Sequence, residues 1–189
     1  LKKFSSISII ISSTHKKAIR MQLADMKIKK KEDFAFTTRN RRPPLDNINA
    51  VLSFAYTLLA NDCVNALSSV GLDPYVGFMH GDRPGRNSLA LDLMEELRPV
   101  LADRFILTLV NTKVIQAKHF EKQKGYAVLL NDEGRKVFIN AWQNHKKETI
   151  THPFLKEKIG WGLVPYVQAL LLARTIRGDM EEYPPFLWK

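Results

Sequence analysis

An apolar periodicity that begins just after two consecutive prolines constrains this fold most strongly. Pro43 and Pro44 exclude a helix from the basic stretch "TTRNRRPPLDN", because a proline ring fixes φ and pushes the preceding residue towards extended backbone. Beyond it, apolar side chains recur three and four residues apart, at Val51, Phe54, Ala55, Leu58 and Leu59. That spacing predicts a helix capped by Asp46 or Asn47 and stopped by Gly71.

The same signals predict three more helices. A second begins at Asn87 or Ser88, and Pro99 should kink it, since the ring clashes with the carbonyl four residues earlier. Another starts near residues 131–132, and a last one ends near Gly178. The expected fold is all-α, with at most a small hairpin near residues 126–130.

Charge is concentrated at the beginning of the chain. Residues 1–44 carry twelve Lys or Arg against three acids, whereas residues 45–189 carry seventeen against sixteen. This imbalance indicates contact with a polyanion such as nucleic acid. The single cysteine, Cys63, cannot form an internal disulfide and favours a reducing, cytoplasmic location. No run of 18 to 20 apolar residues suggests a membrane span, so no membrane partner is expected.

The stretch "GFMHGDRPGRNSLALDLMEEL" contains the chemically informative residues. Asp92, Glu95 and Glu96 stand three and four positions apart, a spacing that shares one helix face and favours a cation between the carboxylates. His80, fifteen residues before Glu95, could join that carboxylate on one divalent ion. The alternatives are a solvated acidic face and a loop histidine without a ligand role.

Two arginines in this loop could contact phosphate. Arg83 and Arg86 carry guanidinium groups that match phosphate oxygens, and together with a metal they would indicate phosphodiester chemistry. The alternative is that they only pair with Asp82 and Asp92. Four other histidines lie in polar stretches without partners at metal-ligand spacing and are predicted at the surface: His15, His119, His145 and His152.

Several long motifs in order resemble one family. "RNRRPPLDNINAVLSFAYTLL", "VGLDPYVGFMH", "SLALDLMEELRPVLADR", "LNDEGRK" and "YPPFLWK" are similar to the catalytic C-terminal domain of the CRISPR-associated endonuclease/integrase, which inserts new spacers into CRISPR arrays. The resemblance covers about residues 34–189, and the last motif resembles the I-C branch. It implies an all-helical, metal-binding domain preceded by a β-rich domain.

The resemblance also implies a site and partners. The family binds Mn²⁺ or Mg²⁺ through a glutamate, a histidine and an acidic residue; His80 and Glu95 match the last two, and Asp92 matches a further acidic position. All three are therefore expected at the catalytic centre. Arg41, Arg42, Arg83 and Arg86 are the expected DNA contacts. The implied partners are double-stranded and branched DNA, a second copy of the chain in a homodimer, and a small ferredoxin-fold CRISPR adaptation subunit.

The beginning of the chain departs from the family pattern. The family's first metal-binding glutamate falls in register near "IISSTHKK", and no glutamate precedes Glu32. We therefore expect residues 1–40 to be a remnant or basic linker, with the β domain absent or only a remnant, and residues 41–189 to form the helical domain. Two hypotheses remain: a metal-dependent DNA endonuclease/integrase, impaired by the missing ligand, or a non-catalytic truncated helical DNA-binding or assembly module.

Overall fold

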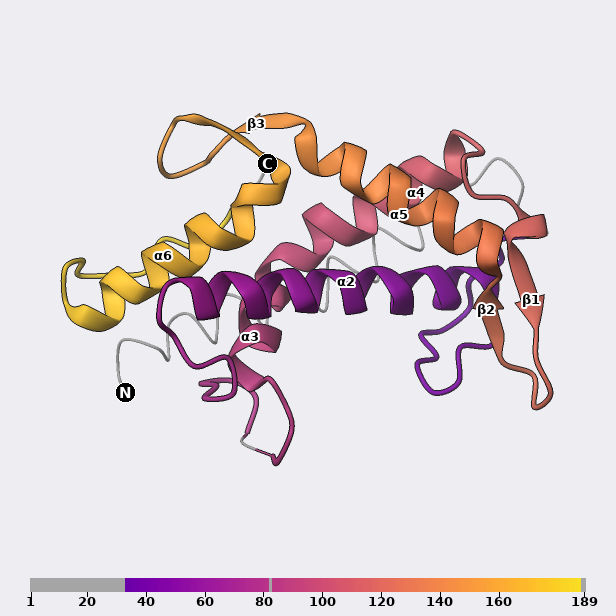
Figure 1. The fold of residues 1–189 in the computed structure, drawn as a ribbon, viewed down its shortest axis with the longest axis horizontal. Helices are drawn as coiled ribbons and strands as arrows, with labels where there is room; N and C mark the ends of the chain where they lie inside the picture. Colours follow the sequence, from indigo (N-terminus) through magenta and orange to yellow (C-terminus); the bar gives the residue numbers. More distant parts are fainter. Residues whose placement is uncertain (1–32, 82, 188–189) are drawn as a thin grey trace.

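Helix α2 (Asn47–Ser69) runs through the middle of the fold, and the other long helices lie against it (Figure 1). The computed structural model describes residues 33–81 and 83–187. Its further α-helices are α3 (Ser88–Leu97), α4 (Arg104–Asn111), α5 (Asp132–Lys147) and α6 (Val164–Arg177). The predicted all-α class is confirmed. The expectations for the remnant in residues 1–32 lie outside the described residues, and the boundary at residue 40 stays a prediction.

Local signals account for both ends of α2. The side chain of Asp46 caps its first turn, since Oδ1 accepts a hydrogen bond from the backbone N–H of Asn49 at 2.7 Å. Gly71 follows the other end with φ of 81°, a conformation that glycine adopts without strain. By length and composition α2 could cross a membrane, but a core helix passes the same test. Buried residues such as Ile48, Val51 and Leu52 make it the core of this fold.

Pro99 interrupts the helix that begins with α3. The chain forms a π-helical segment, η1 (Arg98–Asp103), in which the backbone N–H of Arg104 donates to the carbonyl of Pro99, five residues earlier. Helix α4 follows directly. The predicted irregularity at Pro99 is therefore a widened turn, because proline lacks the N–H that an α-helical ladder would need there.

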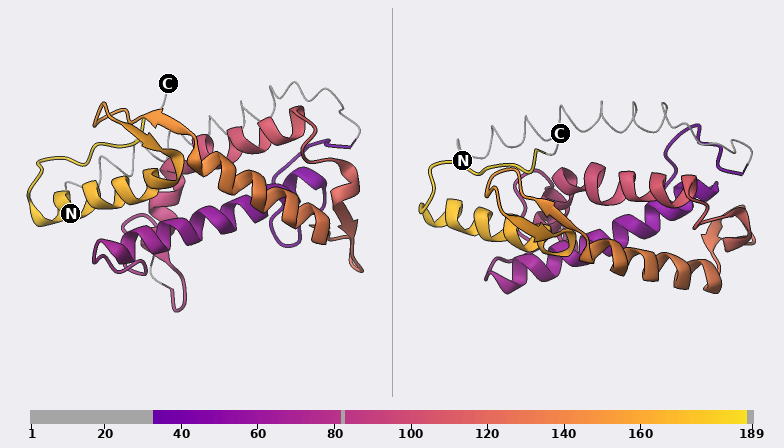
Figure 2. Two further views of the ribbon diagram at one scale, coloured as in Figure 1. Left: turned by 45° about the horizontal axis from the view of Figure 1, so that its top comes forward. Right: turned by 90° about the horizontal axis from the view of Figure 1, so that it is seen from above.

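An aromatic cluster joins three helices. The ring of Phe138 on α5 makes edge contacts with Phe54 on α2 at 5.3 Å and with Phe105 on α4 at 5.5 Å. Trp142, one turn along α5, contacts Phe105 at 5.3 Å. Such pairs add about 0.5–1.5 kcal/mol each beyond the area they bury. They fix α5 across α2 and α4, the arrangement that the views of Figure 2 show.

Two short antiparallel hairpins complete the described part. Strands β1 (Phe120–Lys122) and β2 (Val128–Leu130) pair where a small hairpin was expected. Strands β3 (Thr149–Thr151) and β4 (Lys158–Gly160) form a second hairpin that was not predicted, because three-residue strands give too short an alternation to detect. Single turns η2 (Ala117–His119) and η3 (Trp161–Leu163) precede β1 and α6.

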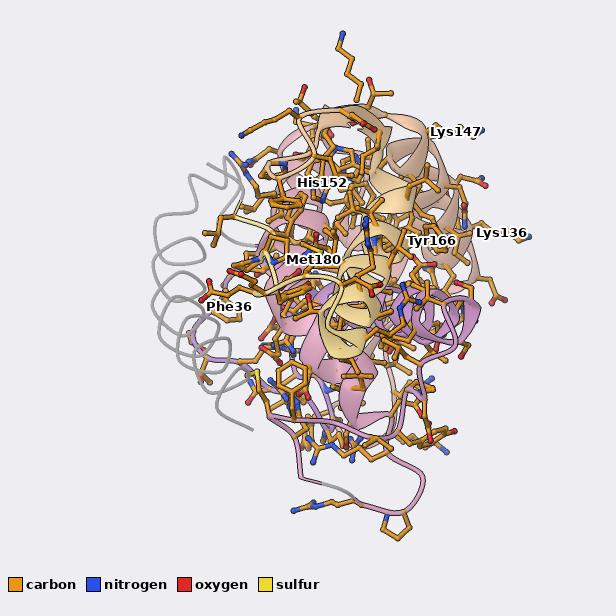
Figure 3. The ribbon with its side chains drawn as sticks, turned by 90° about the vertical axis from the view of Figure 1, so that its left-hand side faces the viewer. Phe36, Lys136, Lys147, His152, Tyr166 and Met180 are labelled. Carbon is orange, nitrogen blue, oxygen red and sulfur yellow. The ribbon has the colours of Figure 1, made fainter. Side chains whose placement is uncertain are left out.

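The chain turns back after α6. Gly178, with φ of 88°, closes the helix as predicted. Residues 179–187, here called the C-terminal strap, then return alongside α6 (Figure 1), and Figure 3 views the molecule from this end. Gln168 of α6 donates to the carbonyl of Pro184 at 3.2 Å. Its Oε1 atom lies 3.1 Å from Nε2 of His152. His152 and His119 are buried, so their predicted surface positions are wrong.

Candidate active site around His80

A buried carboxylate organises the loop that precedes α3. Asp92 has an exposed fraction of 0%, and its Oδ2 accepts the backbone N–H groups of Phe78 at 2.7 Å and Met79 at 2.9 Å. Its Oδ1 accepts the backbone N–H of His80 at 3.0 Å. Three converging donors compensate a charge that would otherwise be costly to bury. Asp92 thus anchors residues 78–80 to the first turns of α3.

The same carboxylate orients the imidazole of His80. Nδ1 of His80 lies 2.6 Å from Oδ1 of Asp92, and the histidine side chain is 25% exposed. With Nδ1 engaged, Nε2 is the ring nitrogen left to bind a ligand. Metal-binding histidines usually have this arrangement, in which a carboxylate holds one nitrogen and so selects the tautomer that binds through the other.

Close backbone contact makes this arrangement dependent on a glycine. A Cβ atom added to Gly77 would lie 2.6 Å from Cβ of Ser88 and 2.9 Å from the carbonyl oxygen of His80. Real Cβ atoms do not approach other atoms so closely, so only glycine lets the loop lie on the beginning of α3. The loop position that presents His80 therefore depends on Gly77.

Glu95, one turn beyond Asp92, forms an ion pair with Arg98. Arg98 is buried, and its guanidinium lies over the ring of Tyr56 at 4.6 Å. The hydroxyl of Tyr56 donates to Oδ1 of Asp103 at 2.6 Å. Burial, and next the charge of Asp103, raise the pKa of Tyr56 above its usual range, so this tyrosine stays neutral and acts as a donor. The side chain of Glu95 is only 17% exposed, and the arginine with which it pairs is held in place by its contact with Tyr56.

Glu96 belongs to a different environment. Its Oε1 accepts hydrogen bonds from Nε2 of Gln168 at 2.5 Å and from the hydroxyl of Tyr183 at 2.7 Å. Burial raises its pKa to about 7. Glu96 therefore does not share the surroundings of Glu95, because the helix turns by about 100° per residue and adjacent side chains diverge. A cation between the carboxylates stays a prediction. Glu96 instead ties α3 to α6 and the C-terminal strap.

The four arginines expected to contact DNA lie in two places. Arg83 is exposed and Arg86 half-buried in the turn after His80, where the backbone N–H of Arg86 donates to the carbonyl of Arg83 at 3.0 Å. Arg41 and Arg42 are exposed before α2. The alternative pairing of Arg83 or Arg86 with Asp92 does not occur, since both oxygens of Asp92 take other donors, whereas Asp82 lies outside the described residues. The role of the four arginines in binding DNA stays a prediction.

Two donors in this region fit a divalent cation. His80 offers a ring nitrogen oriented by the carboxylate of Asp92, and Glu95, three residues after Asp92, offers a carboxylate that is paired with Arg98. Within residues 33–81 and 83–187, however, no three His, Cys, Asp or Glu side chains converge as a ligand set. The role predicted for each site residue stays untested.

Sequence reasoning missed the residues that support the site. Tyr56 and Asp103 follow no spacing that relates them to Glu95, and only the fold brings them to Arg98. The signal that could have found Arg98 is its position three residues after Glu95, which favours an ion pair on one helix face.

Comparisons with known proteins match this chain to one family. Residues 22–144 match the family model described as CRISPR associated protein Cas1. The chain is 61% identical over 157 residues to a CRISPR-associated endonuclease Cas1 of Rhodospirillum rubrum, covering 83% of this chain and 46% of the relative. It is 52% identical over 162 residues to a Cas1 endonuclease of Leptospira interrogans, and the match covers 86% of this chain and 63% of the relative. The matched part of the chain thus spans about half to just under two thirds of the length of these curated relatives.

Solved structures give the same family likeness. A casposase bound to its integration product matches with a TM-score of 0.74 and 29% identity over 84% of this chain and 45% of that chain. A Cas1 protein of Thermotoga maritima matches with a TM-score of 0.71 and 30% identity over 80% of this chain and 47% of that one. A complex described as Cas6-RT-Cas1–Cas2 matches with a TM-score of 0.68 and 25% identity over 83% of this chain and 17% of that one.

Proposed function

Because the chain belongs to the Cas1 family of CRISPR-associated proteins, we propose that it is a metal-dependent DNA endonuclease/integrase acting in spacer acquisition. Phosphodiester transfer or hydrolysis would take place beside His80. The observation that supports this most is the 2.6 Å contact between Nδ1 of His80 and the buried carboxylate of Asp92. It leaves Nε2 as the ring nitrogen that would bind the ion.

His80 and Glu95 would hold the divalent cation, manganese or magnesium. When bound, such an ion lowers the pKa of a coordinated hydroxyl or water and neutralises charge on a phosphate. Asp92 acts through His80, because both of its oxygens are occupied by donors from residues 78–80. Arg98 holds Glu95 in place, since a buried guanidinium stabilises the adjacent carboxylate.

DNA would approach from the side of the loop that follows His80. Arg83 and Arg86 lie three and six residues beyond the histidine, so they can contact phosphates next to the reacting one. Arg41 and Arg42 would contact the same DNA farther along. One structural neighbour is a casposase bound to an integration product, and another is a complex that contains Cas1 and Cas2. The first supports DNA as a partner, proposed to be double-stranded or branched, and the second supports an adaptation subunit, proposed to be small with a ferredoxin fold. The homodimer is proposed from the family resemblance alone.

A cytoplasmic location completes this proposal. Cys63 is a buried free thiol, which suits a reducing compartment. Burial raises its pKa and keeps it protonated and unreactive.

One observation favours the second candidate, a non-catalytic DNA-binding or assembly module. Within the described ranges the protein contributes two donors beside the loop rather than a complete ligand set. Losing a ligand should weaken metal affinity by more than the 10–100-fold that a lost supporting residue costs. In that case the chain would bind DNA and its partners but would not cut or join strands.

A manganese titration separates the two candidates. We expect the purified chain to nick or join branched and double-stranded DNA as Mn²⁺ rises, and His80→Ala and Glu95→Ala each to reduce the rate at least 10-fold. Glu181→Gln, an exposed carboxylate in the C-terminal strap, is the matched control and should keep the rate. Equal activity in the parent and in the double variant of His80 and Glu95 would overturn the proposed site.

A further inference from the structure

An exposed tyrosine lies at the tip of the β1–β2 hairpin. Tyr126 is 87% exposed. Its φ of 66° is a left-handed backbone conformation that residues other than glycine rarely adopt. The adjacent Gly125 has φ of 97°, so the two residues together turn the chain between the strands. The ring of Tyr126 therefore contributes almost nothing to the core, yet the tip holds it out from the protein.

The base of this hairpin is firmly attached. Val128 and Leu130 of β2 are buried, and the ring of Phe120 on β1 makes an edge contact with buried Phe34 at 5.9 Å. Because the strands are fixed and only the tip projects, Tyr126 is presented by a rigid support. Figure 1 places the hairpin at the end of the molecule opposite α6.

Positive charge surrounds the tip. Lys122, the last residue of β1, and Lys124, in the turn just before Gly125, are both exposed. The backbone N–H of Val128 donates to the carbonyl of Pro44 at 2.8 Å, which fixes the segment that carries Arg41 and Arg42 beside β2. These four cations have no ion pair with a described residue. The exposed acid Glu121 is the opposing charge on β1, and its Oε1 lies 3.5 Å from Nε2 of Gln123.

We infer that this hairpin end, made of Arg41, Arg42, Lys122, Lys124 and Tyr126, binds unpaired nucleotides of DNA, with the tyrosine ring stacked on a base. Lysine and arginine supply the phosphate contacts, and an exposed aromatic ring supplies a sequence-tolerant platform, the combination used to bind single strands. A base offers its face only where it is unpaired or at a duplex end. The expected ligand is therefore a single-stranded segment or a junction rather than continuous duplex.

A protein partner fits the surface less well. The cores of protein interfaces are depleted in lysine and rich in adjoining large apolar residues, whereas Tyr126 is flanked by Gly125 and Ala127, with Lys124 one residue farther away. The choice of DNA rests on the proposed function. The contact itself needs no metal, so it can be measured apart from catalysis.

The test measures binding of a labelled single-stranded oligonucleotide to the full chain by fluorescence anisotropy in EDTA. Tyr126→Gly should weaken binding about tenfold, the effect of losing one stacked base. Tyr126→Phe, which keeps the ring, should bind within about twofold of the parent. Glycine adopts a φ of 66° readily, so the thermal midpoint of Tyr126→Gly should not fall. Tyr166→Ala, which removes a 42% exposed tyrosine on α6 (Figure 3), is the matched control and should bind like the parent.

A second arm tests the charges. The affinity for a single strand falls as salt rises, and each phosphate contact contributes about 0.7 to the steepness of log affinity against log salt. Lys122→Gln combined with Lys124→Gln should therefore make this slope less steep by about 1.4. Lys147→Gln, a lysine that projects from the far end of α5 (Figure 3), should leave the slope unchanged.

Three results would overturn the inference: no binding of the single strand by the parent chain, equal binding by Tyr126→Gly, or an equal loss of affinity for a closed hairpin duplex without free ends. None of them bears on manganese-dependent cleavage. Conversely, His80→Ala can abolish cleavage while the single strand still binds, in which case only the catalytic proposal is affected.

Discussion

Oδ1 of Asp92 accepts two hydrogen bonds from one residue, the backbone N–H of His80 at 3.0 Å and its Nδ1 at 2.6 Å. One carboxylate therefore fixes both the position of the loop and the orientation of the ring. A substitution at Asp92 should affect stability and metal binding together, although Asp92 itself has no oxygen left to bind an ion.

Asp92→Asn tests this double role. The amide would turn an NH₂ group towards backbone N–H donors, so at least one buried hydrogen bond to a charge is lost, at about 1.5–3 kcal/mol in the free energy of unfolding. We also expect Mn²⁺ affinity to fall about 10–100-fold. Urea unfolding and titration calorimetry check the two effects. Unchanged Mn²⁺ affinity in a destabilised variant would leave Asp92 a purely structural role; Glu181→Gln is the control.

Gly77→Ala tests the contact between the loop and α3. The new methyl group would meet the backbone of His80 at 2.9 Å and must push the loop from α3. We expect a loss of about 1–3 kcal/mol in the free energy of unfolding, as overpacking typically costs. Gly81→Ala, where an added Cβ meets nothing within 4 Å, is the control and should change stability little. Equal thermal midpoints for the two variants would contradict the structure of this loop.

Replacing Arg83 and Arg86 by glutamine tests DNA contact beside the site. Each phosphate contact contributes about 0.9 to the steepness with which log affinity for duplex DNA falls against log salt. Removal of two contacts should therefore make this slope less steep by about 1.8. Arg104→Gln with Arg174→Gln, two exposed arginines on α4 and α6, is the control. A slope equal to that of the parent protein would show that Arg83 and Arg86 do not reach phosphate.

Glu96 makes stability depend on pH. Its pKa is about 7 in the folded chain against an ordinary 4.5, because burial disfavours the charged form. Between these values the unfolded chain binds fewer protons, so stability falls as pH rises through this window, by at most about 3 kcal/mol. Glu96→Gln still accepts hydrogen bonds from Gln168 and Tyr183 and should abolish that fall. The measurement is urea unfolding at pH 5 and pH 8.

His152 makes stability depend on pH in the opposite direction, so its effect must be separated from that of Glu96. Burial lowers the pKa of His152 below its ordinary value of 6.5, so its contribution to stability is lost as the pH falls below 6.5. This loss is the same in the parent protein and in Glu96→Gln. The difference between the two proteins therefore isolates Glu96. A constant difference from pH 5 to pH 8 would mean that Glu96 is ionised throughout.

The elements that were predictable from sequence are those decided by neighbouring residues. Asp46 caps α2, Gly178 closes α6 and Pro99 disrupts its own helix because each acts within one turn. Glu95 pairs with Arg98 three residues later, a spacing that the sequence displays, whereas the partner of Glu96 is Gln168 of α6, 72 residues along the chain. A periodic pattern reports that a face is polar or apolar, but not which distant donor will meet it.

The buried histidines were misplaced for the same reason. The stretch around His152 is polar in the sequence and indicates a surface position. In the structure the ring of His152 is buried, and its Nε2 contacts the side chain of Gln168, sixteen residues away. The contact of His80 with Asp92 also joins residues twelve apart across a loop. That both residues belong to one site was predicted from the residue types and the family resemblance, whereas the hydrogen bonds that join them became known only from the three-dimensional structure.

The widened turn at Arg98–Asp103 contains about one residue more than an α-helical turn, because its hydrogen bond spans five residues instead of four. Deletion of Pro99 would allow an ordinary α-helical turn and would change the rotation of α4 relative to α3 only slightly. Phe105 would then keep its place in the aromatic cluster, and His80 and Asp92 upstream would keep their contact. Deletion of one residue within α3 or α4 would instead rotate the following residues by about 100°. The junction can therefore lose a residue more easily than either helix, because its extra residue is not needed to align the half of the chain that carries His80 with the half that carries the aromatic cluster.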